Sequence, residues 1–66
     1  MAFEILLHGI PPGAVRQRIV DLVGQDRVVV DGDRLVLTLP DQPAAIGALA
    51  AINDLGCDVD ELRRAP

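Results

Sequence analysis

His8 and Cys57 are the only histidine and the only cysteine in the chain, and they are the residues best suited to nucleophilic chemistry. A cysteine beside a histidine can form a nucleophile and base pair. The chain has no serine or tyrosine that His8 could activate instead. A lone cysteine among aliphatic residues is more often a small core or edge residue than a nucleophile. We therefore expect no catalytic residues, and a small enzyme with His8 as its base is only the third alternative.

Two groups of carboxylates have the residue types that bind hard cations. Asp31 and Asp33 flank a glycine, and Asp58, Asp60 and Glu61 lie close together near the end of the sequence. The Asp-Gly-Asp segment is typical of a tight turn with solvated carboxylates. The second group lacks a histidine or a further ligand at a suitable spacing. Neither glycine-rich phosphate-binding motif is present, so we expect no metal and no cofactor.

The composition excludes several classes of partner. The 66 residues are 50% hydrophobic, but Phe3 is the only aromatic residue, so no stacking surface for bases exists. A net charge of -4 argues against binding to nucleic acid or to an anionic membrane surface. A single cysteine suits a reducing compartment. The longest uncharged stretch, 42–53, is shorter than the roughly 20 residues that span a bilayer, so we expect a cytoplasmic protein without membrane insertion.

The first half of the chain predicts a strand followed by a helix. Residues 3–8 alternate well enough for a strand, with Leu6 and His8 on one face. Prolines then open a helix that follows Gly13 and ends near Gly24. Its predicted apolar stripe consists of Val15, Ile19, Leu22 and Val23.

The second half predicts a hairpin, a helix and a final strand. Strands over 27–30 and 34–39 flank the Asp-Gly turn. Asp41 is a good N-cap for a helix that ends at Gly56. A weaker edge strand should cover 57–62 and fray beyond it, because Glu61 and Leu62 break its alternation. The predicted apolar stripe of the helix consists of Ile46, Leu49, Ile52 and Leu55.

Two successive β-α-β units indicate an α+β fold with one domain over residues 1–66. Such units interleave into a ferredoxin-like βαββαβ sandwich, in which two helices cover one face of a four-stranded antiparallel sheet. The first and third strands should be central. The face without helices would then carry an interaction face of Leu6, His8, Val29, Val36 and Thr38, flanked by Glu4 and Arg34.

Three aliphatic side chains on the bare face of so small a sheet form a patch worth a few kcal/mol if it is covered, at roughly 25 cal/mol per Å². The alternative is that scattered surface aliphatics are ordinary and that valine simply suits strands. The uncharged strand Val28–Val30 offers a second route to a partner, by strand addition. Small residues on the second helix could either pack against the first helix or admit a partner backbone; these are Ala44, Gly47, Ala48 and Ala51.

Two resemblances add expectations about function. The stretch VVVDGDRLVLTLPDQPAAIGALAAINDLGCDVDELRRAP resembles the small C-terminal accessory domain of daunorubicin-resistance-type ABC transporter ATP-binding subunits. The shared pattern is an apolar strand, DGDRL, a strand ending in PD, an Ala/Leu-rich helix closed by glycine, and a last strand leading to RR-P. It covers residues 27–66. This resemblance implies a non-catalytic regulatory or assembly role beside an ATPase.

The segment LTLPDQPAAIGALAAINDLGCDVDEL is also similar to the first strand, helix and second strand of an ACT domain. That likeness implies an amino-acid effector bound at a dimer interface. The effector loop would be formed by Gly9, Pro12 and Gly13, at the start of the first helix.

These observations favour a non-catalytic regulatory module that associates through its open sheet face or its edge strand. The expected partner is a protein or a second copy of the chain, which makes a homodimer the expected assembly. The alternative is an ACT-like effector-binding domain.

Overall fold

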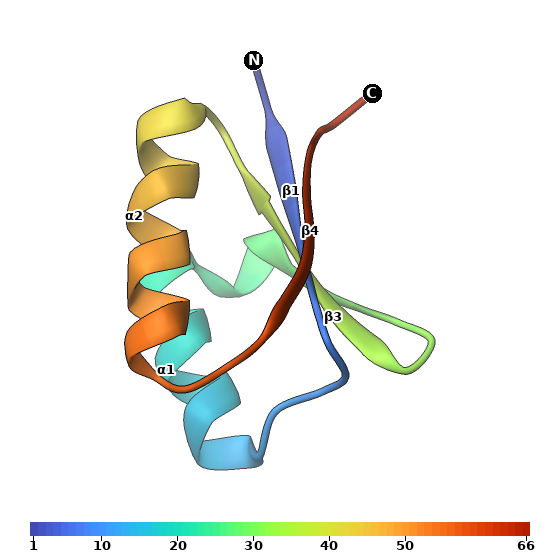
Figure 1. The fold of residues 1–66 in the computed structure, drawn as a ribbon, viewed down its shortest axis with the longest axis vertical. Helices are drawn as coiled ribbons and strands as arrows, with labels where there is room; N and C mark the ends of the chain where they lie inside the picture. Colours follow the sequence, from blue (N-terminus) through green and yellow to red (C-terminus); the bar gives the residue numbers. More distant parts are fainter.

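The chain alternates strands and helices in the order β-α-β-β-α-β. The computed structural model describes residues 1–66, and Figure 1 shows its course. The elements are β1 (Phe3–Leu7), α1 (Gly13–Val23), the 3₁₀ turn η1 (Gln25–Arg27), β2 (Val28–Asp31), β3 (Arg34–Leu39), α2 (Gln42–Asp54) and β4 (Val59–Arg64).

The four strands form one antiparallel sheet in the order β2-β3-β1-β4. Both helices lie on the same side of this sheet (Figure 1). The prediction of an α+β chain with a four-stranded antiparallel sheet and two helices is therefore confirmed, as is the central position of the first and third strands. The opposite face of the sheet carries no helix and is called the open face.

The hydrophobic core lies between the helices and the sheet. Successive side chains of a strand point to opposite faces of the sheet, so every second residue of β1 and β3 faces the helices. The core contains no polar side chain. Its buried members are Ile5, Leu7, Ile19, Leu35, Leu37, Leu39, Ala45, Ala48 and Ile52.

Local sequence signals set the ends of the helices. Asp41 Oδ1 accepts a hydrogen bond of 2.9 Å from the Ala44 N–H, which caps α2 as predicted. Gly24 follows α1 with φ of 98°, and Gly56 follows α2 with φ of 80°. Residues with a Cβ rarely adopt such angles, so these glycines allow the chain to turn back toward the sheet.

Three of the four strands have bounds that differ from the prediction, and β2 extends to Asp31 rather than ending at Val30. β1 ends at Leu7, one residue before His8, and β2 begins after Arg27, which belongs to η1. β4 covers 59–64 rather than 57–62. Its C-terminal residues do not fray, because Arg63 and Arg64 pair with the first two residues of β1.

The predicted helical stripes are wrong at two positions. Leu22 on α1 and Ile46 on α2 are exposed. α2 instead places Ala45, Ala48 and Ile52 against the sheet. Small side chains let this helix approach the strands closely, so its buried face is centred on alanines rather than on the largest aliphatic residues.

None of the helices combines the length and the apolar character that crossing a membrane requires.

Candidate interaction surface

The open face of the sheet brings together the residues that the sequence predicted, but it does not expose most of them. Leu6 pairs with Val36, and Val36 pairs with Val29, so these three side chains are neighbours on one face. Leu6 is only 5% exposed and Val36 only 7%, whereas Val29 is 52% exposed. Thr38 is half-buried. The expectation of an open aliphatic patch on this face is therefore wrong at its two central residues.

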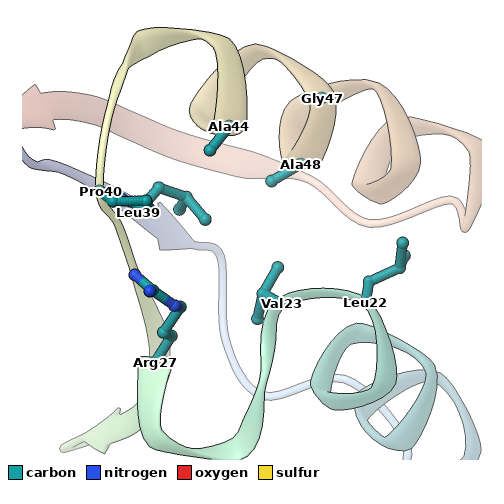
Figure 2. Close-up of a pocket in the computed structure, with 8 residues that line it drawn as sticks. All are labelled: Leu22, Val23, Arg27, Leu39, Pro40, Ala44, Gly47 and Ala48. Carbon is teal, nitrogen blue, oxygen red and sulfur yellow. The ribbon is translucent and has the colours of Figure 1, made fainter.

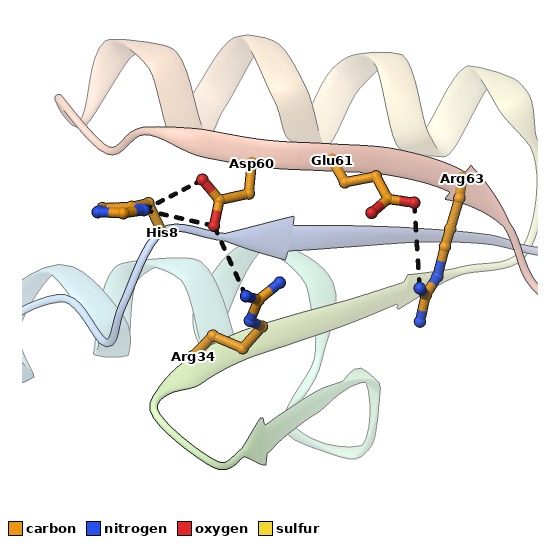
Figure 3. Close-up of polar contacts among 5 residues, drawn as sticks. All are labelled: His8, Arg34, Asp60, Glu61 and Arg63. Atoms are coloured by element: carbon orange, nitrogen blue, oxygen red, sulfur yellow. Dashed lines mark hydrogen bonds and ion pairs between the residues drawn. The ribbon is translucent and has the colours of Figure 1, made fainter.

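Charged side chains from neighbouring strands cover the middle of the open face. Asp60 on β4 lies 3.1 Å from His8 Nδ1 and 3.9 Å from Arg34 on β3. Figure 3 shows these side chains meeting over the end of β1. Because a carboxylate can only accept, the Nδ1 atom of His8 carries the hydrogen of that bond.

A second ionic group lies toward the other end of the face. Arg63 Nε donates to Glu4 Oε1 at 3.0 Å. Arg63 Nη1 also lies 4.0 Å from Glu61 Oε2, the contact that Figure 3 draws. Since no helix covers this face and Leu6 and Val36 are nevertheless buried, we infer that the stems of these long side chains shield the two residues from water. The face is a self-covered surface with a charged exterior, and a partner would have to displace these ion pairs.

A β-bulge in β4 positions the acidic side chains that lie over the open face. Leu6 pairs with Glu61, but Leu7 pairs with Val59, which leaves Asp60 as the extra residue of β4. The phase break that the sequence shows at Glu61 and Leu62 is this bulge. It places two successive acidic residues beside β1, and Asp60 bridges His8 and Arg34.

The two edges of the sheet differ in how they are protected. β4 carries the bulge and a series of charged residues, which are the usual features that keep a strand edge from pairing with another chain. β2 has the sequence Val-Val-Val-Asp and pairs without a register shift. Val29 and Val30 on β2 are 52% and 45% exposed. β2 is therefore the less protected edge. Its length of four residues limits how many hydrogen bonds it could form with another chain.

The hairpin determines which backbone groups of β2 face outward. Asp31 and Arg34 are the first and last residues of the turn, the positions that a β-turn joins by a hydrogen bond. Along an antiparallel ladder, hydrogen-bonded and non-hydrogen-bonded pairs alternate. Asp31 and Val29 thus bond to β3, while the backbone groups of Val28 and Val30 point away from the sheet.

His8 and Cys57 have different surroundings. His8 is exposed and its Nδ1 faces Asp60, while Cys57 packs against the core. No hydrogen bond joins the two side chains, although both line a small hollow. No group of three or more His, Cys, Asp or Glu side chains is placed to hold a metal ion.

The loop predicted to bind an effector borders that same hollow. Pro12 lines it, while the Gly9 carbonyl accepts a hydrogen bond from Leu35 N–H at 3.2 Å, and Gly13 begins α1. The hollow has a volume of about 200 Å³. Sites for small molecules are usually about 300–1,000 Å³, so this geometry adds no support to the effector interpretation, which stays a prediction.

A shallow apolar groove of about 400 Å³ separates the end of α1 from the start of α2 (Figure 2). Small residues on α2 create this space, since they leave a gap opposite Leu22 and Val23. Arg27 lies at one side of it, beside Leu39 and Pro40. The residues that line the α2 side are Ala44, Gly47 and Ala48.

No protein-family model, no curated protein and no solved structure matches the chain. The function must therefore be inferred from the surfaces of the molecule: the open face, the two strand edges and the groove.

Proposed function

We propose that the chain is a non-catalytic, cytoplasmic protein-interaction module of ferredoxin-like fold that recruits its partner by strand addition to β2. The two β-α-β units, with β1 and β3 in the middle of the sheet, support the ferredoxin-like assignment. The partner supplies an extended segment that continues the sheet beyond β2.

The contrast between the two sheet edges is the observation that carries this proposal. A bulge and a series of charged residues protect β4. β2 presents uncharged valines, the outward N–H and carbonyl of Val30, and the outward carbonyl of Val28, whose N–H already donates to the Gln25 carbonyl. Main-chain hydrogen bonds would supply affinity, and the exposed valines would supply apolar contact on both faces of the extended sheet. The open face contributes less to partner binding than the sequence predicted, because Leu6 and Val36 at its centre are already buried.

The resemblance of residues 27–66 to the accessory domain of ABC-type ATP-binding subunits suggests one class of partner. That segment includes β2 and the whole hairpin. An ATP-binding subunit with an extended segment near its end is thus the first natural partner to test, and the role of this chain would be regulation or assembly.

Selection of peptides from a random library on the immobilised wild-type chain tests the proposal directly. Val30→Pro removes an outward N–H of β2 without removing a bond to β3, which proline tolerates at a strand edge. Val29→Lys keeps every backbone group and adds a charge that discourages edge pairing. Leu22→Ser, in the groove between the helices, is the matched control.

We expect the selected peptides to bind the two β2 variants at least tenfold more weakly than the wild type, and to bind Leu22→Ser unchanged. Thermal unfolding would verify that each variant is folded. A library that yields no binders, or peptides that bind both β2 variants as tightly as the wild type, would refute strand addition at β2.

A further inference from the structure

Arg27 is the only arginine that is withdrawn from water without gaining a partner. Its side chain is half-buried, yet it forms no ion pair and no hydrogen bond. A partly desolvated cation without a counter-ion is unfavourable, so its surroundings favour an added anion. The other arginines are either ion-paired, as Arg34 and Arg63 are, or exposed, as Arg16, Arg18 and Arg64 are.

The 3₁₀ turn η1 determines where this side chain lies. The Arg27 N–H donates to the Gly24 carbonyl at 3.1 Å, and the Val28 N–H donates to the Gln25 carbonyl. Val28 packs against the core, so a regular strand that began at Arg27 would direct the arginine to the open face. Because η1 interrupts the strand geometry, Arg27 lies on the helix side of the sheet instead.

The arginine borders the apolar groove between the end of α1 and the start of α2 (Figure 2). It is the only charged residue among the eight that line this groove, and no carboxylate lines it. Asp41 follows the groove residue Pro40, but its Oδ1 accepts the Ala44 N–H at the start of α2. The volume of about 400 Å³ lies within the usual range for small-molecule sites.

Charge and lining together indicate the chemistry of a ligand. A guanidinium can bind a carboxylate through two parallel N–H···O bonds. One arginine matches one negative charge, which suits a monocarboxylate better than a phosphate dianion. The rest of the lining offers Leu22, Val23 and the small residues of α2, which provide apolar contact and no further hydrogen-bond donor from a side chain.

We propose that this groove binds a linear aliphatic monocarboxylate, with the carboxylate on the Arg27 guanidinium and the hydrocarbon chain between Leu22 and Ala48. The inference goes beyond the proposed function, since it assigns a small-molecule site on the helix side of the sheet. The proposed function concerns strand addition at the β2 edge.

NMR shift titration of the isotope-labelled full chain with hexanoate, octanoate and decanoate tests the site, at about 0.15 M salt to screen distant charges. Octanamide has the chain length of octanoate without its charge, and octylammonium has the opposite charge. Arg27→Glu reverses the charge beside the groove. Arg18→Glu changes the net charge equally but lies on α1 outside the groove, so it is the matched control.

We expect the wild type to bind octanoate roughly tenfold more tightly than octanamide, because a hydrogen bond to a charged group contributes about this factor. Affinity should increase from hexanoate to octanoate by up to about fourfold per methylene. Arg27→Glu should bind octanoate at least roughly tenfold more weakly than the wild type and should prefer octylammonium. Arg18→Glu should behave as the wild type does.

The inference would be overturned if decanoate up to about 10 mM gave no saturable shift of residues lining the groove. Equal binding of octanoate and octanamide to the wild type would also overturn it, and this comparison needs no variant to fold. Equal weakening by Arg18→Glu would indicate a general charge effect and refute the role of Arg27. Tighter binding of N-acetyl-Leu-Leu than of decanoate would refute this ligand class in favour of a peptide C-terminus. Peptide selection on β2 is measured separately, so the proposed function and this inference fail independently.

Discussion

Leu6 shows how a residue's position and its environment can point to different roles. It lies on the face without helices, as the alternation of β1 predicts, yet it is almost fully buried. Its cross-strand partners on that face are Val36 on β3 and Glu61 on β4. Leu6 therefore contributes to the stability of the fold, while Val29, on the same face but at the edge, stays available for contact.

Substituting these two residues separates the roles. Leu6→Ala should lower the free energy of unfolding by about 2–4 kcal/mol, because it removes buried methyl groups and leaves a cavity. Val29→Ala should lower it by less than about 1 kcal/mol, since half of this side chain is exposed. Urea denaturation of both variants is the measurement. Equal losses would mean that the charged side chains do not shield Leu6.

At the scale of the elements, α2 combines a well-defined start with an interior that is not optimal for a helix. Asp41 caps it, but Gly47 lies exposed in its middle turns. A Cβ added at Gly47 would meet no other atom within 4 Å. Nothing within the chain thus requires glycine at this position.

Gly47→Ala should raise the free energy of unfolding by about 0.5–1 kcal/mol, because alanine has the higher helix propensity. Gly24→Ala is the matched contrast: this glycine has φ of 98°, and a Cβ there would lie 3.1 Å from the Asp26 side chain. That variant should be less stable than the wild type. Thermal unfolding followed by circular dichroism would measure both changes, and a loss of stability in Gly47→Ala would show a constraint that the packing of α2 does not explain.

At the scale of the whole molecule, the sheet order determines which parts are most protected. β1 and β3 are paired on both sides and face the helices, whereas β2 is paired on one side only. A small domain of this kind opens locally at its edges more readily than at its centre.

Amide hydrogen exchange should reflect this order. The amides of Ile5 and Leu37 should exchange only through global unfolding, and the outward amide of Val30 should exchange fastest within the sheet at low protein concentration. A strongly protected Val30 amide in dilute solution would contradict the assignment of outward groups on β2.

Much of the architecture could be predicted from local sequence signals. The cap at Asp41, the glycines that end the helices and the turn at Gly32 act on neighbouring residues, so their effects are visible along the chain. Strand alternation likewise placed Leu6, Val29 and Val36 on the open face. The phase break at Glu61 marked the bulge, although the sequence did not show what the bulge would do.

The sequence by itself determined the elements, their order and the residues assigned to each face of the sheet. Only the tertiary structure decided that Leu6 and Val36 are covered and that β2 is the less protected edge. Exposure depends on side chains more than fifty residues apart, as in the contact of His8 with Asp60. Such contacts exist only once β4 has paired with β1, because pairing and register bring the charged side chains over the aliphatic ones.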